Sequence, residues 1–255
     1  MERLPFTSYH LVFQIQLHSL THTSMKYFIV PIFFCILSVP SFSQTTGKIS
    51  TSLNYQTGNT EQTSIAGRLD LDTKFSDEIE SNLNFQTNYG EQFGTVFDRI
   101  YKGSFELDVD ADDFYPLLFV SAENNMNRKI DLRFNGGIGF GFADDKIGVD
   151  SKTSVMLLWE YSDMVGIEPI SKPMVSFRTR LKKKLESGMS TRLVFLMQKY
   201  LTGDVYRMTS TFSMSYPVYK SLSFLFTAEH RYETVQVQGV KPNDFSTMFG
   251  LEFGI

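Results

Sequence analysis

The chain is dominated by a two-residue alternation of apolar and polar side chains. Near its end, Phe245, Phe249 and Phe253 occupy odd positions of residues 244–255, and small or polar residues fill most of the even ones. Residues 130–142 alternate in the same way, with Ile, Leu and Phe opposite Asp, Arg, Asn and Gly. Because successive side chains of a strand point to opposite faces, this pattern predicts strands with one apolar and one polar face.

Twelve segments of residues 44–255 show this alternation, and several have ten residues or more. Strands of soluble proteins usually have about 5–6 residues, whereas a tilted strand that crosses a membrane needs about 9–11. The crowding of Phe and Leu on one face suits a lipid-covered exterior around a wet lumen. The pattern therefore favours an all-β fold, an antiparallel transmembrane β-barrel of about 12 strands, over a soluble β-sandwich. The expected strands cover residues 47–56, 61–74, 79–89, 97–110, 115–123, 130–142, 147–160, 173–183, 189–199, 205–216, 221–232 and 244–255.

An export signal precedes these strands. Met25 and Lys26 begin a basic region, residues 27–39 are mostly apolar, and the small residues Ser41 and Ser43 follow two positions apart. This order is typical of a secretory signal peptide, and the apolar run is shorter than the roughly 20 residues of a spanning helix. We therefore predict a non-native N-terminal extension at residues 1–24, a signal peptide at residues 25–43 and the barrel at residues 44–255.

The connections between the segments predict an orientation in a membrane. Most even-numbered connections are short, whereas the longer ones, residues 88–96, 161–172 and 233–243, are odd-numbered. Short periplasmic turns, longer external loops and periplasmic termini are typical of outer-membrane barrels. We expect the protein in the outer membrane of a Gram-negative-type bacterium, in contact with outer-membrane lipid and inserted by the barrel-assembly machinery. The sequence leaves the oligomeric state open.

Composition argues against several other kinds of function. The chain has a formal net charge of −4 with dispersed charges, whereas a nucleic-acid binder shows a basic patch, so we expect no nucleic-acid partner. The single cysteine, Cys35, lies in the predicted signal peptide, which excludes disulfides and thiolate metal sites from the barrel. The pairs Asp70 with Asp72 and Asp108 with Asp110 lack the loop spacing of a calcium site. We expect no metal and no cofactor.

A membrane-embedded hydrolase of the lipase type is one alternative function. Barrel lipases place a histidine close to a serine so that the imidazole can activate the hydroxyl group. The one histidine of the predicted barrel, His230, is followed by Arg231 and Tyr232 instead. We interpret His230, with Trp159, Tyr161 and Tyr232, as part of the aromatic girdle at the membrane surface.

Two further alternatives stay open. A protease-type hydrolase would need acidic residues near the outer rim, where Asp131 and Glu229 are the candidates. A soluble periplasmic β-protein that binds a ligand would also show alternating strands. Neither alternative supplies a convincing set of catalytic residues, so we expect no catalytic site and do not expect an enzyme.

Three segments resemble a known family. Residues 57–60 with the following strand, residues 101–108 and residues 130–142 resemble the salt-induced outer-membrane protein family (domain of unknown function four-eight-one). The resemblance implies an outer-membrane barrel without an established activity, so it supplies no catalytic residues. One feature departs from barrel proteins, which often end on an aromatic residue that the insertion machinery recognises. Here Ile255 is last, and Phe253 lies two residues before it on the same face.

Charged side chains on the polar face are expected to line the lumen. Acidic residues lie on the second and fourth expected strands and basic ones on the eighth and ninth, which stand on opposite walls of a twelve-strand ring. We hypothesise that they create an electric field across a narrow passive channel for ions or small solutes. Alternatively, they pair and plug the lumen, which would leave a structural barrel. The lumen-lining candidates are Asp70, Asp72, Glu106, Asp108, Asp110, Arg178, Arg180, Lys182 and Arg192.

Overall fold

The computed structural model describes residues 44–57, 62–92, 95–109, 114–144, 148–234 and 237–255. The chain divides into two units, Met1–Ser43 and Gln44–Ile255, and all described residues belong to the second. The expected signal peptide and the expected extension before it lie outside the described residues, and both stay predictions.

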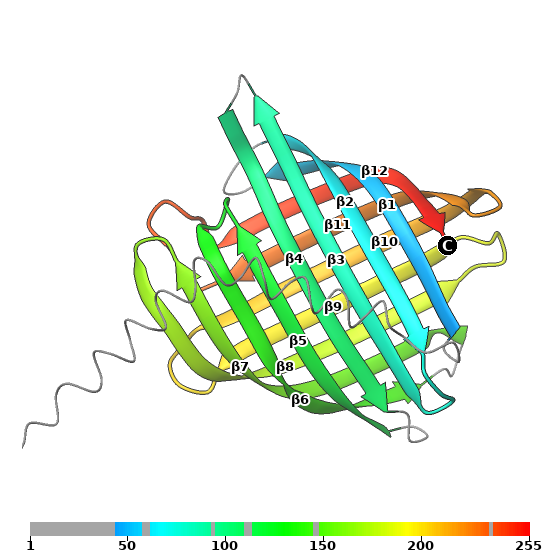
Figure 1. Ribbon diagram of the computed structural model, residues 1–255, viewed down its shortest axis with the longest axis horizontal. Helices are drawn as coiled ribbons and strands as arrows, with labels where there is room; N and C mark the ends of the chain where they lie inside the picture. The colour runs from blue at the N-terminus through cyan, green and yellow to red at the C-terminus, as the bar shows by residue number, and fades with distance from the viewer. Residues whose placement is uncertain (1–43, 58–61, 93–94, 110–113, 145–147, 235–236) are drawn as a thin grey trace, which may run out of the picture. The chain divides into compact units, whose positions relative to one another are not determined.

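The second unit is a closed antiparallel barrel of twelve strands (Figure 1). Strand β1 closes the ring against β12, where the backbone groups of Gly47 and Ile255 exchange hydrogen bonds of 3.0 and 2.8 Å. The predicted all-β barrel is confirmed. In the described part, no helix is long and apolar enough to cross a membrane. The strands are β1 (Gln44–Thr57), β2 (Gln62–Lys74), β3 (Ile79–Gln92), β4 (Thr95–Val109), β5 (Phe114–Asn125), β6 (Ile130–Asp144), β7 (Asp150–Met164), β8 (Ile167–Lys184), β9 (Ser190–Tyr200), β10 (Tyr206–Tyr219), β11 (Leu222–Glu233) and β12 (Asn243–Gly254).

Each expected segment corresponds to one strand, but the expected loop at residues 161–172 is wrong. Strand β7 continues to Met164 and β8 begins at Ile167, so that only Val165 and Gly166 connect them. Gly166 has a φ of 81°, a conformation that glycine adopts without steric cost. A tight hairpin therefore replaces the long loop.

The expected loop at residues 88–96 is also mostly strand, because β3 runs to Gln92 and β4 begins at Thr95. This hairpin extends beyond its neighbours in Figure 1. Backbone pairing of β3 with β4 continues to Gln92 and Thr95, although the side-chain alternation fades there. Of the three longer odd-numbered connections that were expected, only the one between Glu233 and Asn243 remains long, and the orientation stays a prediction. We call the end with Gln44, Ile255 and the even-numbered connections the termini end, and the opposite end the loop end.

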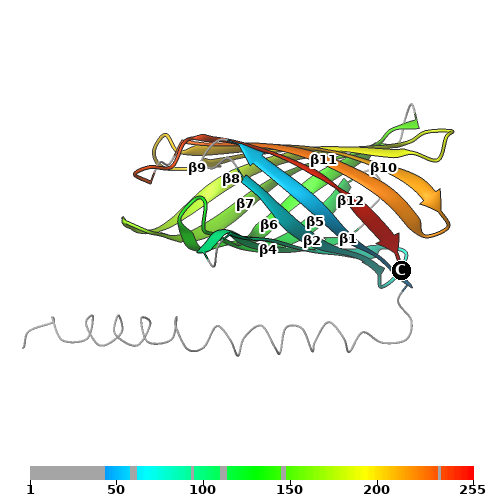
Figure 2. The same ribbon diagram turned by 90° about the horizontal axis from the view of Figure 1, so that it is seen from above.

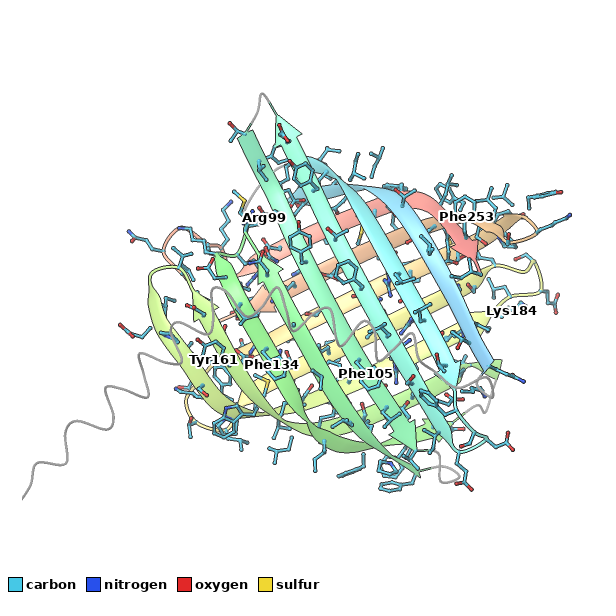
Figure 3. The ribbon with its side chains drawn as sticks, viewed as in Figure 1. Arg99, Phe105, Phe134, Tyr161, Lys184 and Phe253 are labelled. Carbon is cyan, nitrogen blue, oxygen red and sulfur yellow. The ribbon has the colours of Figure 1, made fainter. Side chains whose placement is uncertain are left out.

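The apolar face of the strands lies outside the barrel. Leu53 of β1 and Ile138 of β6 are 60% and 67% exposed, whereas Asn54, one residue beyond Leu53, is only 1% exposed. Phe134 and Phe253, which Figure 3 labels, are both 44% exposed. An apolar surface that continues around a whole barrel fits a hydrocarbon environment, whereas a β-sandwich would bury these side chains in its core.

The barrel is flattened, with β2–β5 facing β8–β11 across a narrow lumen (Figure 2). Glycines sit where the sheet turns between these layers. A Cβ atom added to Gly139 of β6 would lie 2.3 Å from the Val155 oxygen of β7. One added to Gly250 of β12 would lie 2.0 Å from the Thr51 oxygen of β1. Glycine permits such close backbone approach at a barrel corner. The two corners, β6–β7 and β12–β1, are six strands apart in the ring.

The substitution Gly139→Ala tests the β6–β7 corner. The new methyl group would collide with the Val155 backbone, and overpacking of this kind costs about 1–3 kcal/mol or more. We expect a lower temperature for the loss of the compact, heat-modifiable band in detergent gels. Gly103→Ala is the control, because its added Cβ would lie 3.9 Å from the nearest atom. Equal melting of the two variants would contradict the corner assignment.

Candidate functional site in the barrel lumen

Charged side chains on the polar face form two clusters inside the barrel. They come from alternate positions of their strands, as the two-residue period requires. The cluster near the loop end is called the Glu233 cluster and consists of Glu123, Arg128, Arg133, Glu160, Arg207, Arg231, Glu233 and Asp244. The cluster nearer the termini end is called the Glu106 cluster and consists of Glu106, Asp108, Lys152, Arg178 and Arg180.

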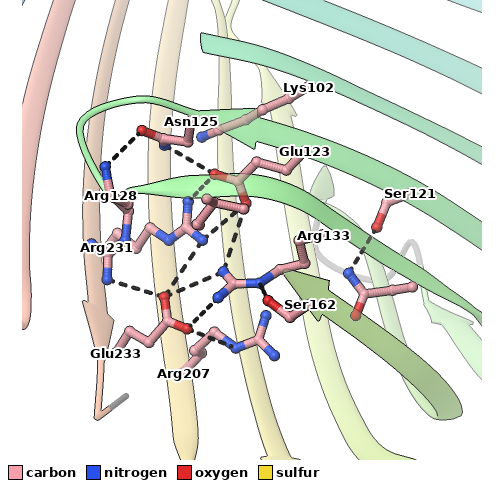
Figure 4. A network of polar contacts seen from close by, with 12 residues as sticks. Lys102, Ser121, Glu123, Asn125, Arg128, Arg133, Ser162, Arg207, Arg231 and Glu233 are labelled. Atoms are coloured by element: carbon pink, nitrogen blue, oxygen red, sulfur yellow. Dashed lines mark hydrogen bonds and ion pairs between the residues drawn. The ribbon is translucent and has the colours of Figure 1, made fainter. Parts of the chain in front are cut away.

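Glu233 of β11 is the centre of the first cluster (Figure 4). Its carboxylate lies 2.6 Å from Nη2 of Arg133 and 3.0 Å from Nη2 of Arg128. Arg207 and Arg231 approach the same carboxylate to 3.5 and 3.7 Å. Glu233 is only 2% exposed, so its charge depends on these four guanidinium groups rather than on water.

Three more carboxylates complete the Glu233 cluster. Glu123 of β5 accepts two hydrogen bonds from Arg231, of 2.6 and 3.0 Å. Glu160 of β7 pairs with Arg207 and accepts a 2.5 Å hydrogen bond from the Tyr200 hydroxyl. Asp244 of β12 pairs with Arg128. Four arginines thus face four carboxylates, and the cluster is balanced in charge.

Arg128 enters this cluster from the turn between β5 and β6, residues 126–129. Its side chain is buried and bridges Glu233 of β11 and Asp244 of β12. The neighbouring Asn127 donates hydrogen bonds to Gln56 of β1, at 3.2 Å, and to Asp98 of β4, at 2.9 Å. The turn is therefore tied to four strands around the lumen and covers part of the loop end.

The Glu106 cluster contains four of the residues that the sequence analysis placed in the lumen. Arg180 of β8 lies 2.6 Å from Glu106 of β4, and Arg178 pairs with the same carboxylate. Asp108 of β4 lies 3.9 Å from Arg180 and 3.7 Å from Lys152 of β7. Acidic and basic groups expected on opposite walls thus pair directly across the flattened lumen, which is the arrangement of the plugged alternative.

The expected acidic residues of β2 remain on their own wall. Asp70 accepts hydrogen bonds of 2.7 and 2.9 Å from Arg68 of the same strand and one of 2.5 Å from Asn84 of β3. Asp72 accepts a 2.6 Å hydrogen bond from Asn82 of β3. These carboxylates are satisfied by neighbours and do not join either cluster.

The remaining expected residues lie at the termini end or outside the described part. Lys182 of β8 and Arg192 of β9 are register partners, so two like charges meet on one wall there. Asp110 lies outside the described residues. The structure therefore brings together Glu106, Asp108, Arg178 and Arg180, and it places Arg192 close enough to Arg180 and to Asp70 and Asp72 of β2 for electrostatic interaction.

Sequence reasoning missed the Glu233 cluster as a unit. Arg133 and Glu229 stand on the polar faces of their expected strands, so the alternation predicts that both side chains point into the barrel. Arg128 carried no such signal, because it lies in a turn where the two-residue period does not apply. Which residues meet depends on the register of several strands, and a single sequence does not state it.

A cluster of apolar side chains fills part of the lumen between the charged clusters. It touches both of them, because Lys152 lies over the Tyr115 ring at 5.3 Å and Arg207 over the Tyr200 ring at 5.7 Å. Two cavities in the lumen measure only about 30 and 10 Å³, and about 10–15 Å³ is enough for one water molecule. The members of this apolar wedge are Tyr115, Leu117, Met156, Leu158, Met174 and Tyr200.

The aromatic girdle candidates lie on the outer surface. His230 is exposed, and its Nε2 atom lies 3.2 Å from the Asn243 side-chain oxygen. Trp159 is 56% exposed and donates a 2.9 Å hydrogen bond to the Ser171 hydroxyl. The contact that the structure gives His230 is therefore with an amide rather than with a serine that it could activate.

The acidic residues considered for a protease-type site have different surroundings. Asp131 is exposed at a register irregularity of β6, whereas Glu229 faces the lumen and lies 3.4 Å from Lys102. Within the described ranges, no group of three or more His, Cys, Asp or Glu side chains is arranged to hold a metal ion. The polar chemistry of the described residues is concentrated in the lumen.

A closed antiparallel barrel with an apolar exterior and a charged lumen defines a porin-like β-barrel. The chain belongs to the family described as "Protein of unknown function, DUF481", whose profile matches residues 49–255. This confirms the family resemblance. No curated protein matches the chain.

Solved structures of similar fold include porins and a translocator domain. The NanC porin has a TM-score of 0.56 at 8% identity, covering 80% of this chain and 98% of that one. The translocator domain of the autotransporter NalP from Neisseria meningitidis has a TM-score of 0.48 at 10% identity, covering 92% and 97%. The anion-selective porin from Comamonas acidovorans has a TM-score of 0.45 at 7% identity, covering 84% and 99%. The likeness to the NanC porin shows a shared barrel fold, and the other two scores are too low to add to it.

The substitution Glu233→Gln tests the centre of the first cluster. It leaves four buried arginines with one carboxylate fewer, and breaking a buried ion pair costs about 3–5 kcal/mol. We expect a clearly lower melting temperature of the heat-modifiable band. Glu186→Gln, at an exposed position between β8 and β9, is the control and should melt like the unchanged protein. A Glu233→Gln protein as stable as the control would show that the cluster contributes no stability.

Proposed function

We propose that the protein is a narrow pore for ions and small polar solutes in the outer membrane of a Gram-negative-type bacterium, and that ion pairs close it in the present state. The observation that carries the proposal is a lumen lined by charged groups that pair across it rather than with their own wall. The apolar exterior supports the membrane location, and membership of the DUF481 family and the porin-like fold support the class.

Ion pairs can close a lumen reversibly. Charged groups on facing strands hold the two layers together, and water that enters can solvate each partner separately. Arg178 and Arg180 face Glu106 from a different layer, so a small separation of β4 and β8 breaks both contacts together. An open lumen of this kind carries both signs of charge, and its lining would select ions by local field rather than by net charge.

A structural barrel without transport is the second candidate function. The small volume of the two cavities favours it, because no solute larger than one or two water molecules fits in them. The two candidates differ in one respect. A pore must conduct when its ion pairs are removed, whereas a structural barrel stays filled by its remaining side chains.

Planar-bilayer recordings of the purified protein separate these functions. Removing Arg178 and Arg180 together (R178A/R180A) takes two long side chains out of the lumen and leaves Glu106 unpaired. We expect conductance several-fold above that of the unchanged protein, with a shift towards cations. The control is K183A/K199A, which removes two outward-facing lysines of β8 and β9.

The conductance is interpreted only for protein that shows heat-modifiable mobility in detergent gels, because this mobility indicates a folded barrel. A charge-balanced variant, E106Q/R178Q/R180Q, avoids the unpaired carboxylate and should also conduct more than the control. Conductance at the level of bilayer leak in the unchanged protein and in both lumen variants would rule out the pore and leave the structural barrel.

A further inference from the structure

The lumen has two unlike halves. The apolar wedge occupies the side of β5, β7, β8 and β9, where Met174 and Leu158 are each 1% exposed. On the side of β1–β3, β11 and β12, the cavity linings contain charged residues, among them Arg68, Glu229, Arg231 and Asp244, and eight uncharged polar ones. The uncharged ones are Ser50, Ser52, Asn54, Gln56, Gln86, Asn88, Thr227 and Ser246, and we call them the amide wall.

Both cavities lie against the amide wall. The cavity of about 30 Å³ is lined by Asn54 and Ser246, the cavity of about 10 Å³ by Ser52, and Gln86 lines both. The two spaces are therefore neighbours along one side of the lumen. The members of the apolar wedge, by contrast, are all buried.

One buried group of the wall has an unused hydrogen-bonding atom. Asn54 is 1% exposed, and its amide nitrogen donates a 3.3 Å hydrogen bond to Ser64. Its Oδ1 atom has no hydrogen-bond partner within the described protein, although a buried acceptor without a partner is costly. Because Asn54 lines the larger cavity, a water molecule or a small polar solute there would satisfy it.

The loop end of the amide wall is covered by the β5–β6 turn. Arg128 lines the larger cavity and is held by Glu233 and Asp244. Asn127 of the same turn is held by Gln56 of the wall and by Asp98. A four-residue turn can move while its flanking strands stay paired, since loops move more readily than the sheet that carries them.

We infer that small uncharged hydrogen-bonding solutes, with water, cross the lumen along the amide wall rather than along the barrel axis, and that Arg128 closes this route at the loop end. The inference rests on the proposed pore function and specifies its route. Hydroxyl and amide side chains offer donors and acceptors without a net charge, which suits neutral polar solutes. The apolar wedge stays packed and forms the fixed side of the route.

Cysteine labelling in lipid vesicles tests the route. In a C35S background the introduced thiol is the only one, and the uncharged reagent 2-hydroxyethyl methanethiosulfonate is the probe. Ser246→Cys and Ser52→Cys place a thiol on the amide wall. Ser176→Cys is the matched control, because Ser176 of β8 faces the wedge side and is 0% exposed. We expect both wall thiols to be modified at least tenfold faster than the control.

Removing the Arg128 side chain should speed the labelling of thiols on the amide wall but not of the control thiol. With Arg128→Ala added, we expect Ser246→Cys to react about tenfold faster and Ser176→Cys to be unchanged. Lys129→Ala is the control in the same turn, because it removes one positive charge whose Nζ atom donates a 2.7 Å hydrogen bond to the Gln238 carbonyl oxygen rather than to a group of the lumen. Arg128→Lys should give a labelling rate between those of Arg128 and Arg128→Ala, since it keeps the positive charge but not the simultaneous contact with Glu233 and Asp244.

The results distinguish the route from the pore function. Equal labelling of wall and control positions, or no response of Ser246→Cys to Arg128→Ala, would overturn the inference even if the protein conducts. Selective labelling of the wall without bilayer conductance would support the route for water and uncharged solutes and count against the conduction of ions. Heat-modifiable mobility of every variant shows that the barrel is folded during the measurement.

Discussion

Charged side chains that point into the lumen of this closed sheet lose most of their contact with bulk water. The two-residue period that gives the barrel its apolar exterior also turns Arg133, Glu160 and Glu233 inward, away from bulk water. A buried charge is tolerated only when a partner and hydrogen bonds replace its hydration. The lumen therefore has to be organised as paired clusters, and strand register must bring each arginine to a carboxylate.

Flattening of the barrel makes this pairing possible. A round barrel of about twelve strands is wider than one whose side chains just fill the interior. Glycines at Gly139 and Gly250 let neighbouring backbones approach at two corners, and β4 then lies within side-chain reach of β8 and β11. Residues that carry no charge and no side chain thus decide which charged groups meet.

The difference between local and long-range contacts explains which parts of this structure the sequence predicts. The alternation predicts all twelve strands and their faces because it is a local property of each segment. It does not predict that residues 161–172 form strand ends, where Met164, Ile167 and Ile170 pack with Val237 and Val240 of a connection distant in sequence. It places Glu106 and Arg178 in the lumen but separates them, because their contact follows from the flattened section. It gives no reason to consider Arg128, whose role depends on how a turn folds back over strands distant in sequence.

Stability alone does not account for the Glu233 cluster. Buried ion pairs often stabilise a protein no more than well-packed apolar side chains of similar volume. The apolar wedge, which contacts this cluster through Tyr200, shows that part of the lumen is filled in that way. Eight charged groups near the loop end, one of them supplied by a turn, are instead an arrangement that water can separate. A lumen that contains both an apolar wedge and separable ion pairs fits the proposed pore, whose closure can be released.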